Sequence, residues 1–132
     1  MKPQSRMPKF TKPELQIMEA LWAHGALSIR EIQQSFPAKG RPAYTTVQTV
    51  VYRLETKKAV RRTKKISNAH IFEATITRST AHRSLVDNFL ESFGGRTEPL
   101  IATLIDTGRL TLEEIQEAER ILRKRSKREP ST

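Results

Sequence analysis

The sequence predicts a mainly α-helical protein that contains one small β-hairpin. Along most of the chain, apolar residues recur at helical spacing, and these stretches begin with residues that cap helices. Between residues 60 and 76 the spacing changes to alternation, and β-prone residues replace helix formers. No apolar window approaches the roughly 20 residues of a membrane span, so no membrane insertion is expected.

The charge is distributed unevenly along the chain. Of 132 residues, 24 are Lys or Arg and 14 are Asp or Glu, which gives a formal net charge of +10. Residues 1–76 hold 14 basic against 5 acidic side chains, whereas residues 77–132 hold 10 against 9. A surplus confined to one half indicates a polyanionic partner for that half and a different task for the other.

The sequence contains no cysteine, which excludes disulfides, thiolate metal sites and a thiol nucleophile. The first ten residues, MKPQSRMPKF, carry charge without an apolar run. We therefore expect no signal peptide and a cytoplasmic protein. Two prolines among polar and basic residues predict that residues 1–10 form a disordered arm.

Two short helices are predicted next, and each opens with a capping box. Thr11 caps the first helix with Glu14 three residues later, and the apolar stripe that follows runs to Gly25. Ser28 and Glu31 form the capping box of a second helix, which ends before Pro37.

A third helix is predicted from Tyr44 to Lys58. Its valines and Leu54 follow the i, i+3, i+4, i+7 pattern, so this face should pack in the core. The opposite face is polar, nearly uncharged and rich in threonine; it comprises Thr45, Thr46, Gln48, Thr49, Tyr52 and Arg53.

Residues 60–66 and 70–76 are predicted to form the two strands of the hairpin. Ser67, Asn68 and Ala69 between them are typical of a turn. The first strand is too cationic to be buried, since it carries Arg61, Arg62, Lys64 and Lys65.

The remaining chain is predicted to be helical. An amphipathic helix spans about 80–93, a short apolar helix follows Pro99, and a last helix opens with the capping box of Thr111 and Glu114. The predicted organisation is therefore one domain at residues 11–77, a helical region at 78–125 and a basic tail at 126–132.

Three helices followed by a basic two-stranded ribbon form the order of a winged helix-turn-helix. The major groove of DNA admits one helix, and threonine offers base edges both a hydroxyl and a methyl group. We therefore predict that residues 44–58 form the recognition helix and that the wing, residues 60–76, contacts the backbone. The predicted base-reading residues are Thr45, Thr46, Gln48, Thr49 and Arg53. The predicted phosphate contacts are Ser28, Arg30, Arg41, Tyr44, Arg61, Arg62, Lys64, Lys65 and His70.

Each of these features has an ordinary structural explanation. A polar helix face is usually only solvated, and a basic hairpin can be a solubilising edge. Two other functions stay open: a winged-helix module that binds an acidic protein, and an architectural protein that binds DNA without sequence preference. The joint order of the elements and the charge asymmetry favour sequence-specific DNA binding.

Two motifs carry a resemblance to a known family. Residues 10–22 match the pattern LTxxELxIMxxLW at Phe10, Thr11, the run from Glu14 to Met18, and Leu21 with Trp22. Residues 43–57 match AYTTVxTxxxRLxxK almost without a break. The chain thus resembles the BlaI/MecI/CopY family, the penicillinase and methicillin-resistance repressors and their copper-responsive relatives, from about Phe10 to Lys124.

The resemblance implies a homodimer that binds a palindromic operator in double-stranded DNA. In this family the C-terminal helices form the dimer interface, which accounts for apolar stripes that three short helices cannot bury among themselves. The implied interface residues are Leu85, Val86, Phe89, Leu90, Phe93, Leu100, Leu104, Ile115, Ile121 and Leu122.

The chain departs from its relatives where they sense a signal. Copper-responsive members carry C-terminal cysteines, which this chain lacks. The β-lactam-responsive members are cleaved at an Asn-Phe bond in the dimerisation region; the equivalent bond here joins Thr103 to Leu104, and an Asn88-Phe89 pair occurs one helix earlier. The inducing signal and a membrane sensor protease as a further partner stay open.

No enzyme, metal site or cofactor is predicted. His24, His70 and His82 are scattered and have no ligand spacing. The sequence has no phosphate-binding glycine loop, zinc-protease motif or nucleophile elbow. Asp87 and Glu91 form a carboxylate pair only in spacing, which a solvated helix face explains.

Overall fold

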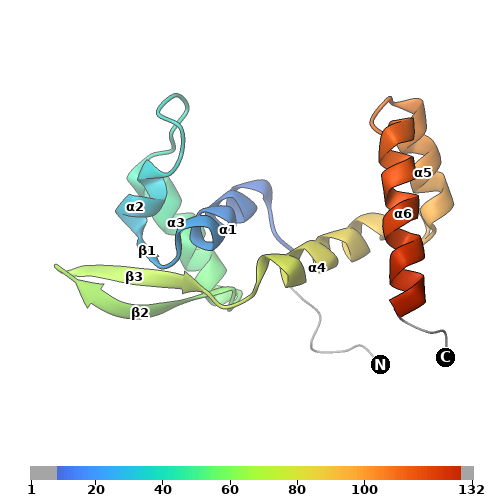
Figure 1. Cartoon of the computed structure of the whole chain (residues 1–132). Helices are drawn as coiled ribbons and strands as arrows, with labels where there is room; N and C mark the ends of the chain where they lie inside the picture. The colour runs from blue at the N-terminus through green and yellow to red at the C-terminus, as the bar shows by residue number, and fades with distance from the viewer. Residues whose placement is uncertain (1–8, 129–132) are drawn as a thin grey trace. The chain divides into compact units, whose positions relative to one another are not determined.

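The computed structural model describes residues 9–128 and consists of six helices and three short strands within that range (Figure 1). The chain divides between Val86 and Asp87 into two compact units. In chain order the elements are α1 (Lys12–His24), β1 (Leu27–Ser28), α2 (Ile29–Gln34), α3 (Tyr44–Thr56), β2 (Val60–Ile66), β3 (Ala69–Ala74), α4 (Arg78–Glu91), α5 (Thr97–Asp106) and α6 (Leu112–Arg128).

Both predicted capping boxes of the first unit are present. The Thr11 hydroxyl accepts the backbone N–H of Glu14, whose carboxylate accepts the N–H of Thr11 at 2.8 Å. Ser28 and Glu31 form the same reciprocal pair at the start of α2. Each box satisfies donors that a helix start otherwise leaves unpaired.

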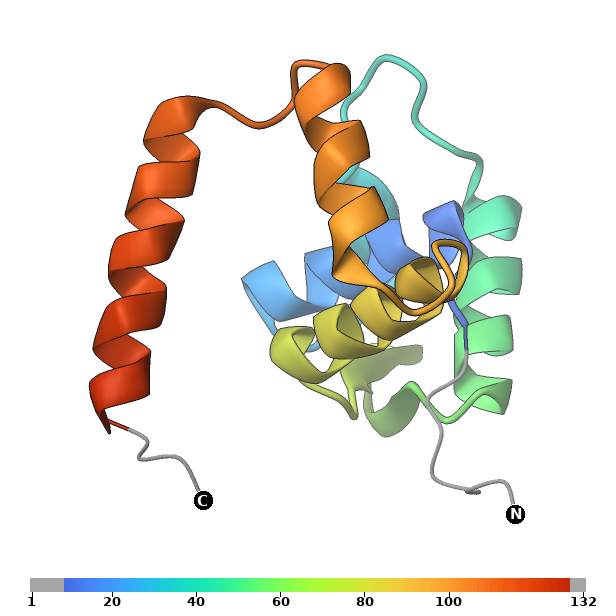
Figure 2. The ribbon, with the colours of Figure 1, turned by 90° about the vertical axis from the view of Figure 1, so that its right-hand side faces the viewer.

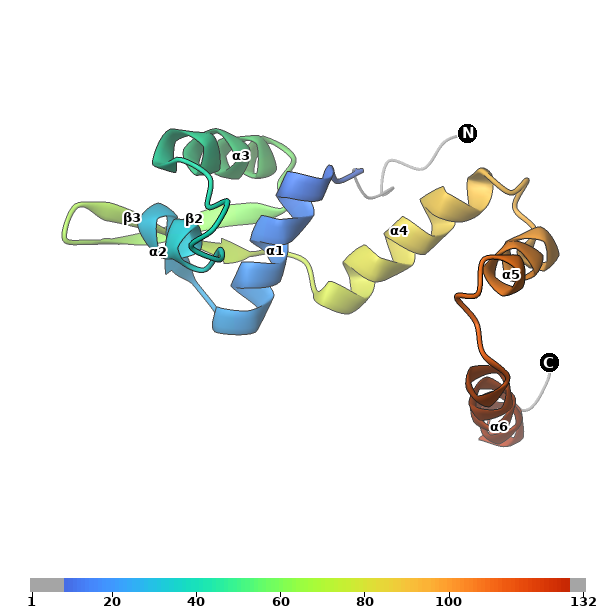
Figure 3. The ribbon, with the colours of Figure 1, turned by 90° about the horizontal axis from the view of Figure 1, so that it is seen from above.

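The predicted hairpin is the larger part of a three-stranded antiparallel sheet with the order β1-β3-β2. β1 was not predicted, because two residues are too few to show an alternating period; Leu27 pairs with Phe72 and Ser28 with Ile71. The turn between β2 and β3 needs only Ser67 and Asn68, both with positive φ, so β3 begins one residue earlier than predicted. The hairpin projects beyond α1, α2 and α3 in two perpendicular views (Figures 1 and 3).

A single hydrophobic core holds the first unit together. Phe72 of β3 lies at 0% exposure among the apolar faces of the three helices. The predicted inward face of α3 is confirmed, since its four apolar residues are at most 7% exposed. The core consists of Ile17, Met18, Leu21, Ile29, Ile32, Val47, Val50, Val51, Leu54, Ala59, Val60 and Phe72.

The first turn of α4 is attached to α1. The Trp22 indole N–H donates to the carbonyl of Ile76 at 2.9 Å, just before α4 begins. Arg78 pairs with Glu19 at 2.9 Å, and Ala81 is fully buried. The first unit therefore includes the start of α4, and reaches beyond residue 77.

The second unit has no core of its own. Among its described residues, 87–127, none is buried. Perpendicular views show α5 and α6 as separate helices that lie apart from each other (Figures 2 and 3). The capping box of Thr111 and Glu114 opens α6 as predicted. α6 continues to Arg128, three residues into the segment for which a tail was expected.

Candidate nucleic-acid interface

The polar face of α3 is turned to solvent. Thr45, Thr46, Thr49 and Arg53 are exposed, and Gln48 is half-buried. With 3.6 residues per turn, the positions of these side chains fall on the side of the helix opposite the valines. The face bears no acidic side chain, and its only charge is Arg53, so it offers hydroxyl and methyl groups along most of its length.

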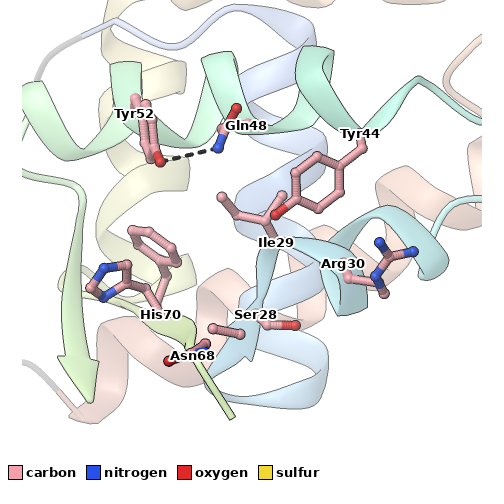
Figure 4. Close-up of a pocket in the computed structure, with 10 residues that line it drawn as sticks. Ser28, Ile29, Arg30, Tyr44, Gln48, Tyr52, Asn68 and His70 are labelled. Atoms are coloured by element: carbon pink, nitrogen blue, oxygen red, sulfur yellow. Dashed lines mark hydrogen bonds between the residues drawn. The ribbon is translucent and has the colours of Figure 1, made fainter. Parts of the chain in front are cut away.

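A groove of about 340 Å³ separates the flank of α3 from β3 and the start of α2. In Figure 4, Tyr44, Gln48 and Tyr52 line it from α3, and His70 lines it from the wing. The Gln48 amide donates to the Tyr52 hydroxyl at 3.2 Å. The groove is lined by Ser28, Ile29, Arg30, Tyr44, Gln48, Tyr52, Asn68, Ala69, His70 and Phe72.

Arg30 and Tyr44, both predicted phosphate contacts, lie together at one end of this groove. The Arg30 guanidinium is 5.5 Å from the centre of the Tyr44 ring. A cation over an aromatic ring is attracted by the ring's quadrupole, so the contact limits the freedom of both side chains. The phenol hydroxyl and the guanidinium remain available as hydrogen-bond donors to an anion.

The two arginines of the wing are engaged within the protein. Arg61 pairs with Glu73 across the hairpin at 2.6 Å. Arg62 donates to both carboxylate oxygens of Glu55 on α3, at 2.8 and 3.2 Å, and lies 5.2 Å from the ring centre of Tyr52. The hydrogen bond to Glu55 raises the pKa of Arg62. The Arg62 contacts join the wing to α3, the Arg61 pair joins the two strands of the wing, and both reduce what either arginine can offer a phosphate.

A β-bulge precedes the two wing lysines. The register of β2 against β3 shifts between Arg62 and Lys64, so that Lys64 pairs with Ile71 and Lys65 with His70. Paired residues lie on the same face of a sheet, and neighbours lie on opposite faces. Lys65 therefore shares the face of His70. Lys64 lies on the other face, where it lines a second groove of about 390 Å³ with Arg30 and Ile66. Both lysines are exposed.

Ser28 and Arg41, two further predicted phosphate contacts, form hydrogen bonds within the protein at the two ends of α2. Ser28 is 8% exposed, and its hydroxyl caps α2. The Arg41 guanidinium donates to the carbonyls of Phe36 at 2.7 Å and Gln34 at 3.1 Å, and thereby closes the end of α2. Arg41 itself is exposed, whereas Ser28 is the least accessible member of the predicted phosphate set.

An ion pair between the start of α1 and the residue that ends α3 was not predicted. The Glu14 side chain is fully buried, and its Oε1 accepts from Lys57 Nζ at 2.7 Å. Burial raises the pKa of Glu14, but the hydrogen bonds from Lys57 and Thr11 and the charge of Lys57 outweigh it, so the pKa is lowered overall. Glu14 Oε2 has no hydrogen-bond partner among the described residues. Because the sequence separation is 43 residues, only the fold brings this pair together.

The apolar residues of the implied dimer interface are on the surface or near it. Val86, Phe89, Ile115, Ile121 and Leu122 are between 38% and 68% exposed. Leu85, Leu90, Phe93, Leu100 and Leu104 are partly buried. Three further apolar residues of this region, Ile101, Ile105 and Leu112, are also exposed. On α5, Ile101 and Ile105 are more exposed than Leu100 and Leu104 of the implied interface.

The two peptide bonds considered for cleavage both lie inside helices. Thr103 and Leu104 are in α5, where the Thr103 hydroxyl donates to the carbonyl of Pro99 at 3.0 Å. Asn88 and Phe89 are in α4, and the Phe89 ring packs edge-on against Phe93 at 5.3 Å.

The described part of the chain contains no group of three or more His, Asp or Glu side chains that could hold a metal ion. None of its helices is both long and apolar enough to cross a membrane.

Comparison with known proteins gives one family and several similar structures. A family model described as penicillinase repressor matches residues 10–124. A penicillinase repressor of Bacillus licheniformis is 23% identical over 124 residues, which cover 93% of this chain and 96% of the relative. The solution structure of the DNA-binding domain of the repressor BlaI is similar with a TM-score of 0.49 and 24% identity, over 60% of this chain and 92% of that domain. The crystal structure of YusO from Bacillus subtilis has the same TM-score and identity, over 89% of this chain and 74% of that one.

Proposed function

The chain belongs to the penicillinase repressor family, a family of DNA-binding transcriptional repressors and not of enzymes, and we propose that it acts as a homodimer on a palindromic operator. The observation that carries the proposal is that α3 has one buried apolar face and one exposed polar face. One face is at most 7% exposed in the core, and the other presents Thr45, Thr46 and Thr49 to solvent. A helix fixed so firmly on one side can enter the major groove with the other.

Base reading falls to the exposed face of α3. The hydroxyl and methyl groups of Thr45, Thr46 and Thr49 suit base edges, Gln48 offers an amide, and Arg53 adds a charged donor further along. Apart from Arg53, these groups carry no charge that attracts phosphate, so the face adds more to discrimination between sequences than to affinity.

Phosphate contacts fall to the groups around the two grooves. Lys64 and Lys65 supply charge from the wing, and Arg30, Tyr44 and His70 supply donors beside α3. Arg61, Arg62, Arg41 and Ser28 contribute mainly by position, because each is engaged within the protein. They hold the wing and the turn before α3 in place.

Dimerisation falls to the helical region, proposed at residues 78–125. Residues 87–127 contain no buried residue and cannot offset the entropy of ordering their backbone, so the apolar ridges of this region need a second chain. Two-fold symmetry would present two copies of α3 to half-sites one or more helical turns of DNA apart.

Selection from a random pool of duplexes tests this function. We expect the enriched sequences to form a palindrome whose half-sites are about 10 base pairs apart, or a multiple of that spacing. Binding to the selected duplex should weaken steeply as salt rises. Enrichment of no motif would indicate an architectural protein, and weak binding without salt dependence would indicate a protein-interaction module.

A further inference from the structure

The groove between α3, the start of α2 and β3 has the size and the lining of a small-molecule site. Its volume is about 340 Å³, and ligand pockets commonly occupy about 300–1,000 Å³. Ile29 and Phe72, both buried, give it apolar surface, and Gln48, Asn68 and His70 contribute polar groups. Apolar surface with a few convergent polar groups is typical of a site that holds a small organic molecule.

One end of the groove is aromatic. Figure 4 shows Tyr52 and His70 at the end away from Arg30. The Arg62 guanidinium, which does not line the groove, lies 5.2 Å from the centre of the Tyr52 ring and 5.4 Å from that of the Phe72 ring. Attraction of this cation to both rings limits their movement. A flat aromatic ring therefore meets a preformed surface at this end, against which it can pack edge-on or with an offset.

The other end of the groove is cationic. The Arg30 guanidinium lies 5.5 Å from the centre of the Tyr44 ring, and in Figure 4 the Tyr44 hydroxyl points into the groove toward Ile29. No acidic side chain is among the described residues that line the groove. A carboxylate at this end can accept hydrogen bonds from a guanidinium and a phenol, and hydrogen bonds to charged groups are the stronger ones. The groove thus favours a negative charge at the end opposite Tyr52 and His70.

We propose that this groove binds a small aromatic carboxylate and that the bound acid opposes DNA binding. The ring of the ligand packs against Tyr52, His70 and Phe72, and its carboxylate accepts from Arg30 and Tyr44. A ring alone leaves the guanidinium unused, and a carboxylate alone leaves the aromatic end in water, so both parts are needed. Ligand binding is argued from the groove itself, whereas its effect on DNA rests on the function proposed above.

The acid opposes DNA because both need the same groups. Arg30, Tyr44 and His70 are the donors beside α3 to which phosphate contacts are assigned above, and all three line the groove. A carboxylate on Arg30 neutralises the charge that a phosphate would meet there. The coupling is reciprocal, so a bound duplex lowers the affinity for the acid by the same factor.

Three acids serve as probes, since the natural ligand is unidentified: benzoate, naphthoate and indoleacetate. Each joins a flat ring to a carboxylate. The matching amides keep the ring without the charge, and cyclohexanecarboxylate keeps the charge without an aromatic ring. Amide chemical shifts of the isotope-labelled full-length chain give the affinity and the location of binding. We expect at least one acid to shift residues of the groove, and its amide and cyclohexanecarboxylate to bind at least about tenfold more weakly.

Variants at the two ends of the groove test the assigned contacts. Arg30→Gln, at an exposed position, should weaken binding of the acid at least about tenfold and leave that of its amide unchanged. Lys64→Gln removes the same charge from a wing position outside the lining, and should leave both affinities unchanged. Tyr52→Leu should weaken the acid and the amide alike, because both lose the ring contact. Circular dichroism checks that each variant is folded.

Gel-shift titration with the selected palindrome measures the effect on DNA. At an acid concentration ten times its dissociation constant, we expect the affinity for the duplex to fall at least about tenfold. The matching amide at the same concentration is the control and should leave the affinity for the duplex nearly unchanged.

The outcomes separate this inference from the proposed function. Failure of all three acids to bind a chain that still selects a palindrome overturns the inference alone. Shifts outside the groove, or binding that survives Arg30→Gln, also overturn it. An acid that fills the groove without weakening the duplex overturns its opposition to DNA. A chain that binds the acid in the groove but selects no palindrome supports the ligand site and overturns the proposed function.

Discussion

The two units of this chain differ in where their apolar residues lie. All fifteen buried hydrophobic residues of the described chain fall at or before Ala81, and residues 87–127 contain none. The first unit therefore closes around its own core, whereas the second leaves its apolar ridges exposed. The difference teaches that one chain can combine a domain that buries its own apolar residues with a helical segment that does not.

The sharpest contrast comes from removing one aromatic ring from each unit. Phe72→Ala should lower the free energy of unfolding by about 3–5 kcal/mol, because the ring is fully buried at the centre of the core. Phe89→Ala, a matched truncation at a ring that is 54% exposed, should change the stability of the first unit far less. Urea denaturation followed by tryptophan fluorescence of Trp22 measures both. Equal losses would contradict the division into two kinds of unit.

Placing a charge on the α4 ridge should separate the chains without unfolding the first unit. Phe89→Asp or Leu85→Asp should weaken dimerisation by about 2–4 kcal/mol, since a carboxylate in an apolar interface loses its hydration without a partner. Sedimentation equilibrium gives the mass. Ser79→Asp, an exposed position in the first turn of the same helix, is the control. An unchanged dimer mass would move the interface elsewhere.

A change on the exposed face of α3 should affect recognition and leave assembly intact. Thr46→Ala should cost about 1–3 kcal/mol of affinity for the selected palindrome and relax discrimination at the base that it reads. Thr103→Ala, a matched substitution on α5, should leave sequence preference unchanged. Gel-shift titrations with the palindrome and its single-base variants distinguish these outcomes; equal losses on all duplexes would remove Thr46 from base reading.

The Glu14–Lys57 ion pair should make the first unit sensitive to acid. The folded protein holds the pKa of Glu14 below its ordinary value, so the pair contributes stability above that value and loses it as pH falls through the folded pKa. Glu14→Gln should therefore be less stable than the native chain at neutral pH, and the difference should shrink below about pH 4.5. Thermal melts across pH report it, with Glu31→Gln as the exposed capping-box control. A constant difference would assign the effect to packing alone.

The smallest expected effect concerns the two wing lysines. Lys64→Ala and Lys65→Ala should each weaken binding to every duplex and lower the slope of log affinity against log salt by about 0.9. Because they are adjacent residues of one strand and lie on opposite faces, their effects should add when both are changed. Affinities across a salt series measure the slope. A slope that falls for only one lysine would show which face of the wing meets DNA.

The sequence predicted the fold of the first unit well because its signals are local. Two capping boxes and the valine face of α3 identify helices from a few neighbouring residues each. β1 and the bulge at Thr63 escaped prediction, since a two-residue strand and a register shift depend on the partner strand. The Glu14–Lys57 pair escaped for the same reason, as it depends on tertiary approach.

The candidate site was predictable in outline and less so in detail. Exposure of the threonine face follows from helical periodicity, which the structure confirms. The sequence shows the positive charge of Arg61 and Arg62 and therefore suggests phosphate contacts. It does not show that Glu73 and Glu55 pair with these two side chains in the folded protein. On α5, the difference between Leu100 and Ile101 is a rotation of one residue, which periodicity alone does not resolve.

The ion pair of Arg62 with Glu55 and its contact with the Tyr52 ring have a consequence for DNA-binding affinity. A wing that moved freely beside α3 would lose conformational entropy on each binding event, and the free energy of binding would be weakened by that cost. Here that loss occurs as the chain folds, so α3 and the wing are held in one arrangement before any partner binds.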